Sequence, residues 1–363
     1  MGPIIDADTH VSESEHMWAL FEREMYPKRP VLVSVPDDTV YGGRNAFWLI
    51  DGNIVPKPAG KAGNVLITPS AAKSQASRTD IPVESRELTD PQVRMRDMDR
   101  LNVHTQVVYP TLFLVYLTDD VALEVALCRA YNRWISDACA KSSGRLRWVA
   151  IPPLRSVEES VKEIHWAKEH GAVGLFFRGI EKDLNLDDPY FFPIYKAAMD
   201  HNLSICIHTG AGSPILSSLF NVERHSAYGH GRVPPLIAFR NLVANKIPEM
   251  FPALKFGFIE ASAGWVPYLL HALKRQSAIR GNGFSDGGLL KKYRLFVACE
   301  ADEDIGYLAR YIGEENMIIG SDYAHRDPSE ERELVKTMRS REDVPAHLTE
   351  KILSDNPRSF YGL

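Results

Sequence analysis

Four side chains with metal-binding chemistry stand at the ends of short apolar segments of the sequence. Asp8 and His10 close the first segment, and their spacing of two residues turns both side chains to the same face of an extended strand. His208 closes a later segment, and Asp322 follows the last one. Imidazoles and carboxylates together suit a borderline divalent ion such as Zn²⁺ or Mn²⁺. If the fold brings these segments together, the four residues form a mononuclear metal site, with Zn²⁺ the first choice and Mn²⁺ the second.

Further polar residues at segment ends are candidates for catalysis or substrate binding. Glu260 could move a proton or join the metal shell, or it could form a structural salt bridge. His325 could orient Asp322 or bind substrate, or it could simply pack behind the site. Arg178 could clamp a substrate carboxylate through its planar guanidinium group, or it could make a surface ion pair. The remaining candidates for substrate binding are His225, His230 and Glu300.

Eight short segments rich in Val, Ile and Phe predict the elements that hold these residues. They cover residues 3–8, 105–109, 146–151, 172–177, 203–208, 254–260, 294–299 and 316–321. Between them, apolar residues recur at helical spacing, as in 157–170 and 304–312. Strands that alternate with helices form parallel crossover units, and eight such units predict a single (β/α)8 TIM barrel over residues 1–363, an α/β fold. An open doubly wound sheet is the alternative, but no Gly-x-Gly-x-x-Gly motif follows the first strand.

Two stretches depart from this repeat and are expected to border the catalytic mouth. Residues 11–89 carry many prolines and glycines and form a long insertion after strand one. Residues 209–235 form a second long loop after strand five. In a TIM barrel the loops that follow the strands line the active site, so both stretches should shape the pocket. A decorative or dimer-forming role for the insertion is the alternative, and a homodimer is left open.

Composition and charge exclude several classes of partner. The 363 residues carry 42 Lys and Arg against 47 Asp and Glu, and no basic run offers nucleic acid a binding surface. The longest apolar stretch, 107–117, is far shorter than the roughly 20 residues that cross a bilayer. The 4 cysteines are far apart in the sequence, and no secretory leader precedes the first strand, so we expect a cytoplasmic protein with a small-molecule substrate.

Four motifs together resemble a known family. Residues 5–10 (IDADTH), 207–210 (IHTG), 258–265 (FIEASAGW) and 320–325 (GSDYAH) look like the amidohydrolase-related, or amidohydrolase 2, family. This branch of the amidohydrolase superfamily includes aminocarboxymuconate semialdehyde decarboxylase and the γ-resorcylate decarboxylases. The resemblance spans residues 3–10 and about 90–362, and it does not cover the insertion.

The resemblance implies one Zn²⁺ or Mn²⁺ held by Asp8, His10, His208 and Asp322. The sequence departs from the family pattern at two positions. The semialdehyde decarboxylases carry His where this chain has Asp8, and a carboxylate there is closer to the resorcylate type and favours a harder ion. The decarboxylases also carry an acid–base His at the end of strand six, where this chain has Glu260.

Two reactions fit this set of residues. In hydrolysis, Asp322 takes a proton from metal-activated water, and Glu260 or His325 protonates the leaving group. In decarboxylation of an aromatic or unsaturated acid, Asp322 delivers a proton to the carbon that loses CO₂. Because Glu260 replaces the expected His, the sequence slightly favours a metal-dependent hydrolase, with decarboxylation as the alternative. A non-catalytic binding barrel is the third interpretation, and it leaves the strand-end residues without a role.

Overall fold

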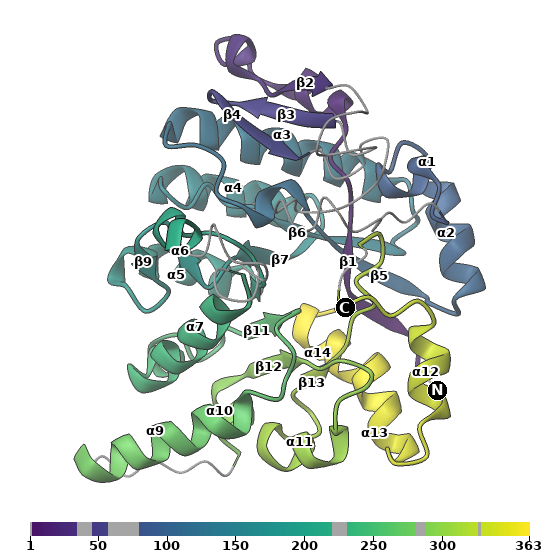
Figure 1. The fold of residues 1–363 in the computed structure, drawn as a ribbon, viewed down its shortest axis with the longest axis vertical. Coiled ribbons are helices and arrows are strands. Elements are labelled where there is room, and N and C mark those ends of the chain that lie inside the picture. The colour runs from purple at the N-terminus through teal and green to yellow at the C-terminus, as the bar shows by residue number, and fades with distance from the viewer. Residues whose placement is uncertain (1, 35–45, 57–79, 220–230, 281–287, 326–327) are drawn as a thin grey trace.

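Eight parallel strands form the barrel that the sequence predicts. The computed structural model describes residues 2–34, 46–56, 80–219, 231–280, 288–325 and 328–363 (Figure 1). The strands are adjacent in chain order: β1 (Ile5–His10), β5 (Thr105–Tyr109), β6 (Leu146–Ala150), β7 (Ala172–Phe177), β10 (Ser204–His208), β11 (Phe256–Ile259), β12 (Leu295–Ala298) and β13 (Met317–Ile318). Almost every strand residue is buried, because helices cover the outside and side chains fill the inside. The TIM barrel fold is therefore confirmed.

The segment after β13 closes the barrel against β1. Ala7 N donates to Ile319 O at 3.1 Å, and His10 N donates to Tyr323 O at 2.8 Å. Between them, Asp322 N donates to Asp8 O at 3.0 Å. A Cβ atom on Gly320 would lie 2.3 Å from Asp8 Cβ, so only glycine allows this close approach. Barrel closure thus places Asp322 directly beside Asp8 and His10.

The outer helices follow the predicted alternation. The longer ones are α2 (Pro91–Arg100), α3 (Val121–Ala140), α4 (Val157–Glu169), α5 (Phe192–Asp200), α7 (Val233–Ala244), α9 (Val266–Arg280) and α11 (Ile305–Ile312). The shorter ones are α1 (Val83–Arg86), α6 (Pro214–Leu219), α8 (Ile247–Met250), α10 (Leu289–Tyr293), α12 (Leu334–Ser340), α13 (Ala346–Glu350), α14 (Asn356–Tyr361) and the single turns η4 (Leu112–Leu114), η5 (Pro189–Phe191) and η7 (Lys351–Asp355). Helices α4 and α11 confirm the two amphipathic segments, and the side chains of Ser156 and Asp304 cap them at their N-termini.

A buried hydrogen-bond chain fixes β1 from inside the barrel. Tyr361 OH donates to Ala7 O at 2.6 Å and therefore accepts from Tyr109 OH, also at 2.6 Å. Both tyrosines are fully enclosed, so these bonds are shielded from water. The strand that carries Asp8 and His10 is therefore anchored below the site to both β5 and α14.

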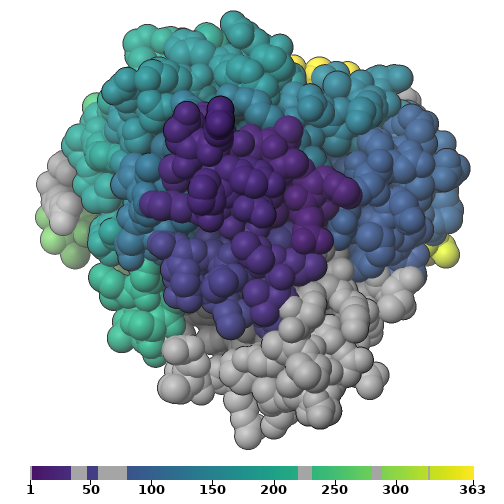
Figure 2. All heavy atoms as spheres, turned by 90° about the horizontal axis from the view of Figure 1, so that it is seen from above, coloured from purple at the N-terminus to yellow at the C-terminus, as the bar shows by residue number. Residues whose placement is uncertain are grey.

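The described part of the insertion after β1 contains a small antiparallel sheet that the sequence analysis does not predict. Its strands are β2 (Val31–Ser34), β3 (Ala46–Ile50) and β4 (Asn53–Pro56), preceded by the turns η1 (Glu15–Leu20) and η2 (Tyr26–Lys28). Thr118, in the loop after β5, donates to Asp51 Oδ2 at 2.6 Å, which ties the β3–β4 turn to that loop. Figure 2 shows the described part of the insertion, in purple, lying over the centre of the face in view.

A second small hairpin, β8 (Ile180–Glu181) with β9 (Leu184–Asn185), follows β7. The loop after β10 is joined to the loop after β5, since Ala211 N donates to Leu114 O at 2.6 Å and Tyr116 N donates to Ala211 O at 3.0 Å. Among the residues that the structure describes, none of the helices combines the length and the apolar character that crossing a membrane requires.

Candidate metal centre

Donor atoms from four strand ends meet at the mouth of the barrel. His10 Nε2 lies 3.5 Å from both Asp8 Oδ1 and Asp322 Oδ1. His208 Nε2 lies 3.4 Å from Asp8 Oδ1 and 3.2 Å from Glu260 Oε2. The structure therefore brings together residues that are more than 300 positions apart in the sequence. It also brings Glu260 into the same cluster.

The two imidazole rings are oriented as metal ligands. His10 Nδ1 lies 2.9 Å from Pro110 O, and His208 Nδ1 lies 2.7 Å from Thr209 O. A carbonyl oxygen only accepts, so in both rings Nδ1 carries the hydrogen and Nε2 presents its lone pair to the cluster. Burial, and the neighbouring rings of His325 and His208, hold the pKa of His10 well below its usual 6.5, so this ring is neutral.

The chemistry and spacing of the cluster fit a divalent ion. Asp8 Oδ1, His10 Nε2 and His208 Nε2 are buried and make no hydrogen bond within the described part of the chain. Buried polar atoms without hydrogen bonds are costly unless another partner satisfies them. Donors about 2.1 Å from one ion lie about 3.0 to 3.4 Å apart in octahedral or tetrahedral geometry, close to the separations observed here. One cation among these atoms would satisfy all three.

Two overlapping groups of possible ligands can be distinguished. In the first, donor atoms of Asp8, His10, His208 and Glu260 all lie within 4.8 Å of one another. In the second, the same limit holds for His10, Glu260, Asp322 and His325. Asp322 thus lies with His325 in the second group, whereas the sequence places it with Asp8 and His208.

Asp322 and His325 are in direct contact at the edge of the cluster. Thr111 Oγ1 donates to Val11 O at 2.6 Å, so it accepts from His325 Nε2 at 2.8 Å. On the other side of the ring, His325 Nδ1 lies 2.9 Å from Asp322 Oδ1, which is an ion-pair contact when the ring is protonated. The ring of His325 also stacks on that of His10, with centroids 3.7 Å apart.

Residues behind the cluster hold it in place, and the sequence analysis does not find them. Arg94, on α2, is fully buried, and it donates to His10 O and to Gln106 Oε1, both at 2.7 Å. Glu13 accepts from Thr111 N and from Leu112 N, both at 2.9 Å, and so fixes the loop that carries Thr111. The only local signal for Arg94 is its place on the buried stripe of α2, between Pro91 and Met98.

Backbone strain is concentrated at the strand ends of the site. Glu260 has φ +57°, Ser262 has φ +58° and Asp322 has φ +52°. Non-glycine residues in this left-handed region cost about 1 to 3 kcal/mol each, and such strain gathers at functional sites. The strained turns point Glu260 and Asp322 into the cluster instead of continuing their strands.

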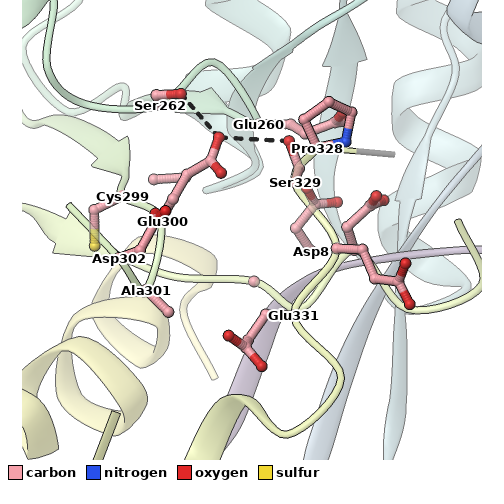
Figure 3. Close-up of a pocket in the computed structure, with 14 residues that line it drawn as sticks. Asp8, Glu260, Ser262, Cys299, Glu300, Ala301, Asp302, Pro328, Ser329 and Glu331 are labelled. Atoms are coloured by element: carbon pink, nitrogen blue, oxygen red, sulfur yellow. Dashed lines mark hydrogen bonds between the residues drawn. The ribbon is translucent and has the colours of Figure 1, made fainter. Parts of the chain in front are cut away.

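A cavity of about 160 Å³ lies beside the cluster, on the side of β11, β12 and β13. Asp8, Glu260 and Asp322 form part of its wall, and Glu300 lies opposite. Figure 3 shows Glu300 linked to Ser262 and Ser329. Arg232 Nη1 also donates to Glu300 Oε1 at 3.2 Å. The cavity is large enough for part of a small organic molecule next to the donor atoms.

The other predicted substrate-binding residues lie elsewhere. Arg178 is paired with Glu181 and donates to Val115 O at 2.8 Å, on the wall of a separate cavity of about 340 Å³ between β5, β6 and β7. That Arg178 binds substrate therefore stays a prediction. His225 and His230 lie outside the described residues.

The fold and the cluster define a TIM-barrel protein with a metal-type site at the carboxyl ends of its strands. A family model described as "Amidohydrolase" matches residues 5–363, and the chain belongs to this family. It is therefore an enzyme of the hydrolase-or-decarboxylase kind that the sequence predicts.

The chain is also similar to three individual proteins. A 2-amino-3-carboxymuconate-6-semialdehyde decarboxylase of Dictyostelium discoideum is 22% identical over 293 residues, which cover 76% of this chain and 77% of the relative. The crystal structure of an amidohydrolase from Mycobacterium avium subsp. paratuberculosis K-10 has a TM-score of 0.79 at 18% identity and covers 99% of both chains. A 5-carboxyvanillate decarboxylase of Novosphingobium aromaticivorans, with bound manganese and a nitrobenzoic acid, has a TM-score of 0.69 at 18% identity and covers 100% of this chain and 97% of that one.

Proposed function

We propose that this protein is a metal-dependent, non-oxidative decarboxylase of a small aromatic or unsaturated carboxylic acid. The sequence alone slightly favours hydrolysis. The two similar proteins with named reactions are both decarboxylases, and one binds manganese together with a benzoic acid analogue. These comparisons support the decarboxylating alternative more than the hydrolytic one.

The contact between Asp322 and His325 is the observation that carries the proposal. Decarboxylation breaks a carbon–carbon bond, leaves its electron pair on the substrate carbon and requires an acid to protonate that carbon. Asp322 Oδ1 lies 3.5 Å from the His10 ligand atom and 2.9 Å from His325 Nδ1, so an imidazole that can supply a proton stands beside a carboxylate at the cluster.

The residues of the site divide this work. When bound, the ion supplies Lewis-acid stabilisation of the substrate's oxygen atoms. Asp8, His10 and His208 hold the ion, and the cavity wall beside Asp8 and Asp322 receives the organic part of the substrate. Asp322 delivers the proton to the carbon that loses CO₂, and His325 supplies that proton to Asp322. Thr111 keeps the His325 ring in the orientation that this transfer needs.

Hydrolysis is the second candidate, because Glu260 replaces the strand-six His of the decarboxylases. A carboxylate 3.2 Å from His208 Nε2 could serve as a base for water. The two candidates make opposite predictions about products, so a single screen separates them.

The test is a screen of the Mn²⁺- and Zn²⁺-loaded enzyme with hydroxylated benzoates and unsaturated dicarboxylates for CO₂ release, beside lactones and amides for hydrolysis. The proposal predicts CO₂ release without an oxidant, incorporation of one solvent deuterium at the carbon that loses CO₂, and loss of turnover in Asp322→Asn. The surface variant Asp343→Asn is the matched control, since its exposed carboxylate pairs with Arg341. Turnover of lactones or amides with no CO₂ release would replace the proposal with the hydrolytic candidate.

A further inference from the structure

We propose that Glu260 is a direct ligand of the metal ion and completes a set of four with Asp8, His10 and His208. Asp322 then lies beside the ion, in contact with His325. The resemblance at the sequence level places the strand-eight aspartate in the metal shell and an acid–base residue at the end of strand six. In this chain the geometry points to an exchange of these two roles. The inference rests on the metal-dependent part of the proposed function and not on which bond is broken.

The distances favour Glu260 as the fourth ligand. Its Oε2 atom lies 3.2 Å from His208 Nε2 and 3.8 Å from His10 Nε2. Asp8 Oδ1 lies 3.4 Å and 3.5 Å from the same two atoms. Donors that share an ion at about 2.1 Å are expected about 3.0 to 3.4 Å apart, so the two carboxylates are spaced alike around the two imidazoles.

The backbone holds Glu260 in this position. The last paired residues of β10 and β11 are His208 and Ile259, so Glu260 is the first residue after the paired part of β11. Thr209 connects both strand ends, because its carbonyl oxygen accepts from His208 Nδ1 at 2.7 Å and its hydroxyl donates to Glu260 O at 2.8 Å. With φ +57° and a side chain only 6% exposed, Glu260 is a strained residue that points inward, as expected of a ligand rather than a surface salt bridge.

Asp322 belongs to the other group of donor atoms. Its Oδ1 atom lies 2.9 Å from His325 Nδ1 and 3.5 Å from His10 Nε2. Asp8, His10, His208 and Glu260 form a group of four whose donor atoms all lie within 4.8 Å of one another, whereas Asp322 is grouped with His10, Glu260 and His325. The first group therefore supplies four ligands without Asp322.

This donor set also predicts the kind of metal. Catalytic Zn²⁺ sites usually have three protein ligands and one open position. Four protein ligands, two of them carboxylates, together with a substrate that must also bind, require a coordination number of five or six. That number and the oxygen-rich donor set suit Mn²⁺ better than Zn²⁺.

The experiment measures Mn²⁺ affinity in the absence of substrate. Metal-free protein is titrated with Mn²⁺, and free Mn²⁺ is followed by electron paramagnetic resonance. Removing the hydrogen-bond partner of a ligand already lowers metal affinity about 10- to 100-fold, so Glu260→Gln should lower it by more than about 100-fold. Glu260→Asp should fall between this variant and the parent, and Asp322→Asn should change the affinity by less than about 10-fold.

Glu300→Gln is the matched control, because it removes one carboxylate from the same cavity wall without removing a member of either ligand group. It should bind Mn²⁺ like the parent protein. The inference is overturned if Glu260→Gln keeps parental affinity, or if Asp322→Asn loses more affinity than Glu260→Gln. Neither result bears on whether the enzyme releases CO₂, so failure here and failure of the proposed reaction remain distinguishable.

A second measurement serves if Glu260→Gln does not fold. A crystal structure of the unmodified protein grown with Mn²⁺ should place Glu260 Oε2 about 2.2 Å from the ion, the usual distance for a carboxylate ligand. An ion more than about 3.5 Å from both Glu260 oxygens, with Asp322 in its shell instead, would overturn the inference.

Discussion

Replacing Thr111 by valine removes a hydroxyl group that makes two buried hydrogen bonds. The residue is 2% exposed, and valine has nearly the same shape, so packing is retained. Val11 O loses its donor at 2.6 Å, and His325 Nε2 loses its acceptor at 2.8 Å. A buried polar group left unsatisfied costs about 1 to 3 kcal/mol, so Thr111→Val should lower the free energy of unfolding by about 2 to 4 kcal/mol.

The effect on catalysis is more specific than the loss of stability. Thr111 contacts Nε2 of the His325 ring, and the same ring contacts Asp322 through Nδ1. Without the hydroxyl group the ring loses the contact that orients it toward Asp322, so kcat should fall about 10- to 100-fold with little change in KM.

Thr118→Val is the matched control. Thr118 is also buried, donates to Asp51 Oδ2 at 2.6 Å and accepts from Asp120 N at 3.0 Å, but it does not contact His325. Both variants are compared by urea unfolding and by the rate of CO₂ release. The reasoning is refuted if Thr111→Val keeps the parental kcat, or if Thr118→Val lowers it equally.

Three further predictions concern the metal, the pH dependence of stability and barrel closure. Chelator should lower the free energy of unfolding by about 3 kcal/mol relative to protein with the ion at 100 times its Kd, as urea unfolding would show. Burial raises the pKa of Glu13 from its usual 4.5 to about 7, so its contribution to stability should fall by about 3 kcal/mol as pH rises from about 4.5 through 7. Burial also raises the pKa of Asp6, from its usual 3.8 to about 7. Urea unfolding at pH 5 and pH 8 should therefore show a loss of stability in the parent that is smaller, but not abolished, in Glu13→Gln. Gly320→Ala would push a methyl group against Asp8, so it should lower Mn²⁺ affinity by more than about 10-fold, whereas Gly306→Ala, with its nearest neighbour 3.8 Å away, should not.

The barrel was predictable because its strands are buried on both faces. Residues 172–177 are a continuous apolar run, and the structure has β7 over the same bounds. The small sheet of β2 to β4 was missed, because prolines and glycines around its strands indicate loops. Strand eight was predicted over 316–321 but is only Met317–Ile318, since the chain at Gly320 turns closely around Asp8.

The site was predictable where its signal is local or follows from topology. Asp8 and His10 stand two residues apart, and the rule that catalytic groups lie at strand ends leads to His208 and Glu260. Thr111 has no such signal, because its importance comes from a hydrogen bond to a residue 214 positions away.

The most direct test of the account is anomalous scattering from a crystal of the protein grown with Mn²⁺, recorded at the manganese absorption edge. The account predicts one strong peak about 2.0 to 2.3 Å from Asp8 Oδ1, His10 Nε2 and His208 Nε2. A well-ordered crystal with no peak among these three atoms, or with the ion bound elsewhere, would contradict it.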